Sequence, residues 1–456
     1  MVEALTNVET DVDFARCDRE VVALLRDYVA IDTTNPPGDV SKAADWVEGL
    51  LHAEGLATQR IGPSPEKANV IATLGADGAS LRPLVLAHHM DVVPAVRDDW
   101  SVEPFGGAVD DGFIWGRGTL DMKGFGVLTL VCLLTLKRLG VTLRRPLRLL
   151  ATADEEVGGI DGAKWLAEHH LDDAGGEFLL TEGSFARAGP RATYYAVQIA
   201  EKGVSTVKLT ARGQPGHASA PRDDNAVVRI ARAIARLGAY RSPPAALGLA
   251  RRYLSAFPPR TLRLAEGRTV ESLSDVEMEE LLYQLSGGSR IQNMLRNTYS
   301  PTMINAGVGQ NVIPAVCEAY VDCRSVPGVT GDDVLAEVAS VIDDPEVALE
   351  LVKSSVGTES PADTELFDAV RAGVGSERPE AIVVPFLTSG GTDCKHFRPR
   401  GVICYGHIPF ELTDAEAERI HGIDERVSLE NLERAFLILF RTVARMCVSG
   451  PEAAAV

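Results

Sequence analysis

LVLAHHMDVVP, residues 84–94, is the stretch from which the fold of the chain can be read. Its first four residues are apolar and Pro94 ends it, a pattern typical of a buried β-strand. Polar side chains follow at once, and the spacing of His89 and Asp91 places both on one face of an extended segment. In open α/β sheets, ligands bind at the carboxyl ends of the strands. The stretch therefore predicts either a metal site or a pair of strand-end histidines followed by a turn aspartate.

Size and charge restrict the class of protein. A chain of 456 residues suits two domains. Its net charge of −19, from 45 basic and 64 acidic residues, argues against nucleic acid or an anionic membrane as partner. The seven cysteines include no CxxC pair, which favours reduced thiols. No apolar signal region opens the chain, and no apolar run reaches the roughly 20 residues that span a bilayer. We therefore expect a cytoplasmic protein.

Periodicity divides the chain into three parts. Strand and helix patterns alternate in residues 1–202 and 356–456, which predicts an α/β domain with a mostly parallel sheet flanked by helices. Residues 203–355 follow the order βαββαβ, which predicts a compact ferredoxin-like α+β domain inserted in the first domain. A largely helical insertion, at about 240–298, follows the first helix of that domain. Its charges indicate a solvated face.

Side chains that commonly bind metals stand at five successive element ends: His89, Asp121, Glu156, Glu182 and His421. Two histidines and three carboxylates without sulfur suit two divalent ions, with one carboxylate bridging and zinc as the expected metal. Glu155 and Glu156 are adjacent, so their side chains diverge. One can bind metal while the other takes a proton from the metal-held water.

Each of these residues also has a purely structural interpretation. Asp121 could cap the helix that follows it, two adjacent glutamates in a loop are commonly solvated, and a lone His421 is commonly structural. GRGTLD, residues 116–121, lacks the third glycine of a dinucleotide loop, which argues against a nicotinamide enzyme. The structural interpretations together require five coincidences at one sheet edge, so the metal interpretation is favoured.

Nine motifs, in one order, carry a family resemblance: HMDVVP, GRGTLDMKG, DEEVGG, TEG, GHAS, NVIP, DCRSVPG, SGGTD and HGIDERV. The chain resembles the M20 family of two-zinc peptidases and amidohydrolases, which includes glutamate carboxypeptidase, acetylornithine and succinyl-diaminopimelate deacylases, aminoacylase and dipeptidases. The resemblance implies one ion held by His89 and Glu182, a second held by Glu156 and His421, and a bridge at Asp121.

The resemblance also implies the catalytic roles. Glu155 would be general base and acid, and Asp91 would orient His89. The peptide bond after Asp121 would be cis. The two divalent ions would be zinc, with cobalt or manganese as alternatives.

Five residues further along the chain would contact substrate. His217 of GHAS resembles the histidine that reaches over a partner's active site and polarises the scissile carbonyl. Asn311 of NVIP and Arg324 of DCRSV resemble residues that fix a free carboxylate of the substrate. Gly390 and Gly391 resemble a loop whose backbone lies against the substrate. A turn histidine, a turn cap and a surface ion pair are the structural alternatives for the first three.

The resulting hypothesis is a hydrolase that cleaves an amide bond next to a free carboxylate through metal-bound hydroxide. Its substrate would be an N-acyl amino acid, a dipeptide or a peptide C-terminus, and the choice between deacylase and carboxypeptidase or dipeptidase stays open. The resemblance also implies that the inserted domain is a lid or dimerisation domain. A homodimer through it would complete its sites in trans, although the helical insertion argues against this. The alternative from another class is a hydrolytically silent small-molecule binder on the same scaffold.

Overall fold

The computed structural model describes residues 9–75, 79–188, 192–286 and 293–449. Contacts divide the chain into two units. Unit 1 consists of Met1–Ile199, Ser360–Phe386 and Gly391–Val456, and unit 2 of Ala200–Glu359 and Leu387–Gly390. The limits predicted for the inserted domain are 203 and 355. The first residues of the chain, from which the absence of a signal region is predicted, and residues 287–292 of the helical insertion lie outside the described residues.

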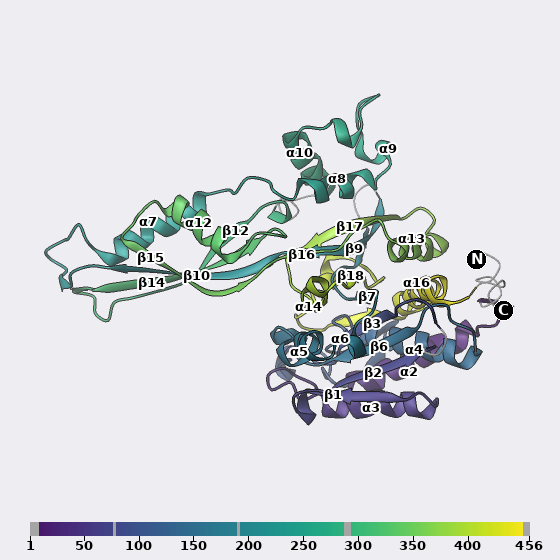
Figure 1. The fold of residues 1–456 in the computed structure, drawn as a ribbon. Coiled ribbons are helices and arrows are strands. Elements are labelled where there is room, and N and C mark those ends of the chain that lie inside the picture. The colour runs from purple at the N-terminus through teal and green to yellow at the C-terminus, as the bar shows by residue number, and fades with distance from the viewer. Residues whose placement is uncertain (1–8, 76–78, 189–191, 287–292, 450–456) are drawn as a thin grey trace. The chain divides into compact units, whose positions relative to one another are not determined.

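Four parallel strands form the centre of the sheet in unit 1 (Figure 1). They are, in spatial order, β6 (Leu147–Thr152), β3 (Leu84–His89), β7 (Phe178–Thr181) and β18 (Ile403–Gly406). All six residues of β3 are buried, as expected for a parallel strand that is covered on both faces. This arrangement confirms the predicted α/β sheet, and it brings the carboxyl ends of the four strands to one edge.

Further strands extend this sheet on both sides, mostly in antiparallel pairs. One side carries β2 (Asn69–Leu74) and β1 (Thr58–Ile61); the other carries β9 (Thr193–Glu201), β8 (Ala186–Ala188) and β19 (Glu411–Leu412), and β16 (Thr358–Glu359) and β17 (Ile382–Thr388) pair with β9. A separate three-stranded sheet consists of β4 (Ala108–Asp110), β5 (Phe113–Trp115) and β20 (Arg426–Ser428).

Helices cover both faces of the central strands. On one face, α4 (Lys123–Leu139) packs against β3 and β6 and against two further helices, α2 (Phe14–Val29) and α16 (Leu429–Cys447). A Cβ at Gly126 of α4 would lie 2.6 Å from the His88 ring, so this close approach of helix and strand requires glycine. The other face contacts α5 (Trp165–His169) and α14 (Cys394–Phe397) in a common apolar core.

Unit 1 also contains α3 (Ser41–Ala53), α6 (Leu171–Ala174), α13 (Glu365–Glu377) and α15 (Asp414–Ala417). Figure 1 shows α3 beside β1 and β2, in agreement with its contacts. Helix α13 packs against α16.

In unit 2 the elements follow one another in the order βαββαβ. They are β10 (Gly203–Arg212), α7 (Ala226–Ala239), β12 (Thr298–Ala306), β14 (Val316–Ser325), α12 (Gly331–Ile342) and β15 (Val347–Ser355). The strands form an antiparallel sheet in the order β12-β14-β10-β15. Alternate residues of β14 are buried beneath the two helices, since a strand turns every second side chain to the same face.

The described part of the segment between α7 and β12 includes the helices α8 (Leu247–Ser255), α9 (Pro259–Leu262) and α10 (Asp275–Ser286). Buried apolar side chains of α8 and α10, such as Leu254 and Met278, give it a small core of its own. Two short strands, β11 (Gly216–His217) and β13 (Val312–Ile313), pair beside the main sheet of unit 2.

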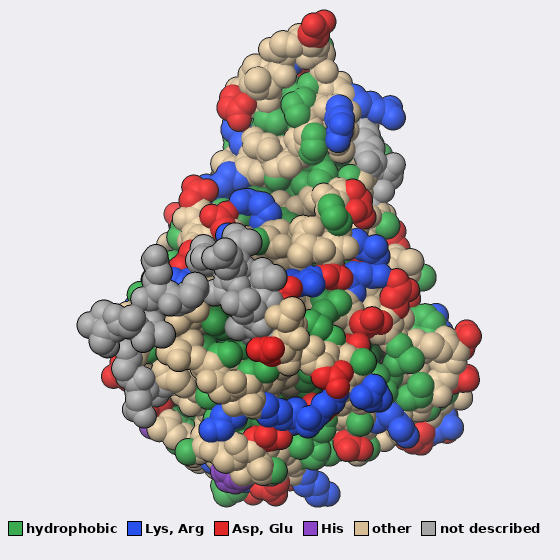
Figure 2. Space-filling view, turned by 90° about the vertical axis from the view of Figure 1, so that its right-hand side faces the viewer, with side chains coloured by type: hydrophobic (Ala, Val, Ile, Leu, Met, Phe, Trp, Pro, Cys, Tyr) green, Lys and Arg blue, Asp and Glu red, His purple; other side chains and the backbone are tan. Residues whose placement is uncertain are grey.

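Three further observations concern the surface, the helices and the cysteines. On the face seen in Figure 2, Lys and Arg side chains are interspersed with Asp and Glu. None of the helices in the described ranges is both long and apolar enough to cross a membrane. All seven cysteines are buried thiols.

Candidate metal centre and substrate-binding residues

Three of the five predicted ligands stand where parallel strands of unit 1 end. His89 is the last residue of β3, Glu182 follows β7, and Glu156 lies in a single 3-10 turn three residues after β6. The parallel order of these strands brings the three side chains to one edge of the sheet.

Asp121 lies in the loop between β5 and α4. The residue that caps α4 is Met122, and it makes no side-chain capping bond, so the Asp121 carboxylate is not the helix cap that the sequence also allowed. One carboxylate oxygen, Oδ1, lies 3.1 Å from Nε2 of His89, and the other, Oδ2, lies 3.1 Å from Nε2 of His421. The Asp121–Met122 peptide bond is cis, as the family resemblance implies. Each oxygen of this carboxylate therefore faces a different histidine.

The five side chains form two overlapping groups around Asp121. In the first, Nε2 of His89 lies 3.6 Å from Oε1 of Glu182; in the second, Nε2 of His421 lies 3.1 Å from Oε2 of Glu156. Ligand bonds of about 2.1 Å at tetrahedral angles place two donor atoms roughly 3.4 Å apart. The spacing and the nitrogen and oxygen chemistry therefore fit two divalent ions.

Burial makes a cation favourable at this site. Burial, and after it the Asp121 carboxylate, raise the pKa of Glu182 to about 8. Hydrogen bonds to Asp121 and Glu156 raise the pKa of His421 to about 10. Oε1 of Glu156 is buried and has no hydrogen-bond partner in the described residues. Three carboxylates in so small a volume attract positive charge, which two metal ions would supply.

Glu155 lies beside the first group. It offers a carboxylate oxygen within 4.8 Å of the ligand atoms of His89 and Glu182. Burial, and then the Glu182 carboxylate, raise the pKa of Glu155 well above its usual value. Its position and chemistry suit a group that takes up and releases a proton beside the candidate ligands.

Asp91 makes contacts that differ from the predicted ones. Its carboxylate oxygen Oδ1 is 3.7 Å from Nδ1 of His89, beyond hydrogen-bond distance, whereas its main-chain carbonyl lies 2.9 Å from that nitrogen. The two carboxylate oxygens instead accept the backbone N–H groups of Glu155 at 3.1 Å and Glu156 at 3.2 Å. Asp91 therefore contacts the His89 ring through its backbone and the loop of the two glutamates through its side chain.

Three residues that the sequence analysis did not identify support the same loop. Asp154 has a φ of 69°, an uncommon conformation for a residue other than glycine. Its Oδ1 accepts hydrogen bonds from Nζ of Lys67 at 2.6 Å and from Nδ2 of Asn35 at 3.2 Å, and Asn35 also donates to Asp91 at 2.8 Å. These donors stabilise the strained turn that directs Glu155 and Glu156 into the site.

Helix α14 supports the loop from the other side. Asp393, the last residue of the SGGTD motif, accepts a hydrogen bond from Oγ1 of Thr152 at 2.9 Å, and the ring of His396 contacts the Gly158 carbonyl at 3.1 Å. The SGGTD motif marks the position of Asp393, but its spacing gives no indication of the contact with β6.

In unit 2, His217 and Asn311 are brought together by the pairing of β11 with β13. His217 pairs with Val312 in this small ladder, and the Asn311 carbonyl accepts the N–H of Ala218 at 3.0 Å. The His217 side chain is exposed, and its Nδ1 lies 2.8 Å from Oγ of Ser219.

Arg324 lies near the carboxyl end of β14 and is held by its neighbour on the same strand face. Asp322 accepts hydrogen bonds from Nε at 2.7 Å and Nη2 at 3.2 Å, while Nη1 lies 3.4 Å from the Ser389 carbonyl. Gly390 therefore follows a residue that Arg324 contacts. A Cβ at Gly390 would meet only Oγ1 of Thr388, at 3.9 Å, so packing within the chain does not require glycine there.

The predicted residues thus fall into two groups within the two units. Unit 1 contains the five ligands, Asp91, Glu155 and Gly391, and unit 2 contains His217, Asn311, Arg324 and Gly390.

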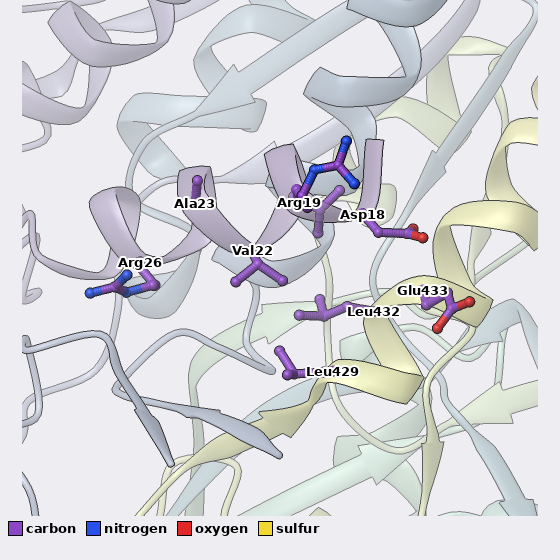
Figure 3. A pocket seen from close by; sticks show the side chains of 9 residues that line it. Asp18, Arg19, Val22, Ala23, Arg26, Leu429, Leu432 and Glu433 are labelled. Carbon is purple, nitrogen blue, oxygen red and sulfur yellow. The ribbon is translucent and has the colours of Figure 1, made fainter. Parts of the chain in front are cut away.

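One pocket in unit 1, of about 350 Å³, lies apart from this chemistry (Figure 3). It is lined by residues of α2 and α16, including Val22, Leu429 and Leu432, with Asp18 and Glu433 at one end. None of the predicted ligands or substrate-binding residues lines it. We therefore place the chemistry at the strand ends rather than in this pocket.

Comparison with known proteins gives matches along most of the chain. Residues 85–445 match the model of peptidase family M20/M25/M40. The probable carboxypeptidase S-like 2 of Dictyostelium discoideum is 30% identical over 365 residues, which cover 78% of this chain and 70% of that protein. The N-fatty-acyl-amino acid synthase/hydrolase PM20D1 of Bos taurus is 30% identical over 389 residues, which cover 81% of this chain and 75% of that protein.

A solved structure shows the same fold. The M20 family metallo-carboxypeptidase Sso-CP2 from Sulfolobus solfataricus gives a TM-score of 0.69 at 16% sequence identity, covering 94% of this chain and 99% of that chain. At this low identity the likeness concerns the fold alone.

Proposed function

Because the chain belongs to peptidase family M20/M25/M40, whose members are metal-dependent hydrolases, we propose that it cleaves an amide bond next to a free carboxylate with the help of two divalent ions. One observation carries this proposal: the two oxygens of Asp121 each lie 3.1 Å from a different histidine, as a bridging ligand requires. The residues that would hold the ions are His89, Asp121, Glu156, Glu182 and His421.

Different residues of the chain carry out the proton transfers and the contacts with the substrate. Bound divalent ions, with zinc expected and cobalt or manganese as alternatives, would polarise the scissile carbonyl and acidify the attacking water. Glu155 takes a proton from that water and delivers it to the leaving nitrogen. His217 donates a hydrogen bond to the carbonyl oxygen as charge develops on it. The seven buried thiols suit the reducing cytoplasm, where we place the reaction.

The substrate class follows from Arg324 and Asn311. A guanidinium group binds a carboxylate through two parallel hydrogen bonds, which suits a leaving group that carries a free carboxylate. The names of the relatives, a carboxypeptidase and an N-fatty-acyl-amino acid synthase/hydrolase, support this class. N-acyl amino acids with long and short acyl groups, dipeptides and peptide C-termini are therefore the substrates to test.

Replacement of Arg324 by alanine should raise KM by about 10–100-fold for substrates with a free carboxylate, because a charge-assisted hydrogen-bond pair is lost. The same substitution should change the turnover of C-terminally amidated substrates far less. Steady-state kinetics with matched acid and amide substrates measure both effects. Lys208→Ala, which removes a positive charge from the same sheet of unit 2, is the matched control. Equal losses with both substrates would remove the carboxylate role of Arg324.

We also propose a homodimer through unit 2, with His217 acting on the partner's substrate. Mixing His217→Ala with Glu155→Ala subunits should then restore roughly a quarter of the wild-type turnover, because half of the randomly exchanged dimers contain one intact site. Each variant alone should be nearly inactive. Light scattering measures the mass, and activity after subunit exchange measures the complementation. A monomer, or a dimer without recovery, would contradict action in trans.

The experiment that tests the proposed function is a hydrolysis panel. Purified protein containing zinc is assayed for amine release from N-acetyl, N-succinyl, N-carbobenzoxy and N-palmitoyl amino acids and from dipeptides. The best substrate decides between deacylase and carboxypeptidase or dipeptidase. Protein that binds two metal ions but hydrolyses none of these substrates would favour the silent binder on the same scaffold.

A further inference from the structure

Two loops that carry metal-ligand candidates are joined by one buried ion pair. Asp121 and His421 are 300 residues apart in the sequence, yet Arg117 near the first contacts Glu425 near the second. Both charged side chains are almost completely buried, with 2% of Arg117 and none of Glu425 exposed. Burying two charges is unfavourable unless their hydrogen bonds are well satisfied, so the partners of each group show what the pair does.

Glu425 binds the backbone of the Asp121 loop. Its Oε1 accepts the N–H of Leu120 at 2.7 Å and the N–H of Asp121 at 3.1 Å, while Oε2 accepts the N–H of Gly118 at 3.2 Å. The main-chain carbonyl of Glu425 also accepts the N–H of Gly116 at 2.9 Å. The Glu425 carboxylate therefore provides the hydrogen-bond acceptors for backbone N–H groups in the loop between β5 and α4, which belongs to no helix or strand.

Arg117 binds the backbone of the His421 loop. Its Nη1 donates to Oε2 of Glu425, and its Nη2 donates to the Gly422 carbonyl at 2.7 Å. Its guanidinium also lies 5.2 Å from the centroid of the Trp100 ring. The Arg117 guanidinium thus binds two groups at once: the carbonyl of Gly422, next to His421, and the Glu425 carboxylate, which in turn binds the backbone of Asp121.

The two histidines of the metal cluster differ in how they are fixed. His89 ends a buried central strand, whereas His421 has a φ of 59° and a side chain that is 53% exposed. His421 lies in a loop, where the N–H of Gly422 donates a hydrogen bond to the Arg419 carbonyl and closes a single turn. Its position relative to Asp121 therefore depends much more on the ion pair than the position of His89 does.

We propose that Arg117 and Glu425 are positioning residues that set the distance between Asp121 and His421, and thereby the affinity for the ion that Glu156 and His421 would hold. The inference rests on the proposed two-metal function and adds a dependence of one ion on a pair of residues that contact neither ion. A pair that only stabilised the fold would weaken both ions alike. A change in the distance between Asp121 and His421 should instead weaken mainly the second ion, because His89 and Glu182 are fixed at strand ends and not by this pair.

The test is a zinc titration of the full chain in buffers of fixed free zinc, with bound metal counted by elemental analysis. Wild-type protein should bind two ions per chain. Glu425→Gln keeps the shape of the side chain and removes its charge, and it should weaken the second ion by about 10–100-fold, as loss of an outer-shell partner commonly does. The first ion should change much less. Cobalt in place of zinc gives a second readout, because its absorption spectrum reports the geometry of each ion.

Two further variants complete the experiment. Arg117→Lys keeps the charge but can reach only one of the two partners, so it should also weaken the second ion selectively, and it provides the test if Glu425→Gln does not fold. Glu177→Gln is the matched control, because it removes the same charge from another arginine pair in unit 1, the pair of Glu177 with buried Arg145. The control should bind both ions as wild type does, whatever its thermal midpoint.

The outcomes separate the two proposals. Equal weakening of both ions, or wild-type affinities in Glu425→Gln and Arg117→Lys, would overturn the positioning role while leaving the two-metal function intact. Wild-type protein that binds fewer than two ions would overturn the two-metal function itself, and the positioning role with it.

Discussion

Replacement of Glu155 by glutamine should lower kcat by about 10²–10⁴-fold, the contribution typical of a positioned general acid and base. Glutamine has nearly the same shape and keeps the backbone N–H that Asp91 accepts at 3.1 Å, so the loop should stay in place. It cannot hold a proton at neutral pH. Because the proton transfer is lost and substrate binding is kept, kcat should fall while KM changes little. Steady-state kinetics on the best substrate of the panel measure both constants.

A comparison with a neighbouring ligand makes this prediction specific. Glu155→Gln should still bind two ions per chain. Glu182→Gln should lose an ion as well as activity, because Oε1 of Glu182 lies 3.6 Å from Nε2 of His89 and the two side chains would share that ion. Metal content by elemental analysis distinguishes the two variants. Turnover within tenfold of wild type in Glu155→Gln would assign the proton transfer to another group.

Removal of metal should abolish turnover and also lower stability. Without cations the cluster contains three largely buried carboxylates, and burial together with the Asp121 carboxylate raises the pKa of Glu182 to about 8, so its charged form is disfavoured there. A ligand that binds only the native state, at 100 times its Kd, stabilises that state by about 2.7 kcal/mol for each site. Chelation should therefore lower the thermal midpoint together with the activity, and zinc, cobalt or manganese should restore both.

Asp121→Ala is the control for metal removal. It takes away the residue common to both groups, so added metal should not restore its activity. Circular dichroism should show that the chelated wild-type protein keeps its secondary structure, because the central strands are buried independently of the site. Protein that is free of metal by elemental analysis and still turns over substrate would contradict the two-metal proposal.

The sequence predicts best where a short apolar run meets a polar cluster. β3, β6 and β7 are such runs, and the residues that follow them could be proposed as a cluster because parallel strands end at one edge. Asp121 was harder to predict, since an aspartate before a helix usually caps it. Only the structure shows that Met122 takes the cap position and that both oxygens of Asp121 face histidines.

Other features were beyond the sequence for identifiable physical reasons. β9 has no counterpart among the predicted strands, because its buried Gln198 and Glu201 interrupt the apolar pattern that identifies an interior strand. Lys67, Asn35 and Glu425 support the site through hydrogen bonds to backbone or carboxylate groups far along the chain. Such contacts leave no periodic signal, since any polar residue in a loop looks the same before the loops are placed.

The position of β18 bears on how the protein is made. This strand, Ile403–Gly406, lies between β7 and β9, so the middle of the sheet in unit 1 is filled by a segment that is synthesised long after both of its neighbours. During synthesis β7 and β9 therefore wait at an open edge while more than 200 further residues are added, and open strand edges invite wrong pairing. Glu425 and His421 emerge later still. A nascent chain thus cannot form the ion pair between Arg117 and Glu425 before residue 425 has been made, and the proposed metal site stays incomplete until then.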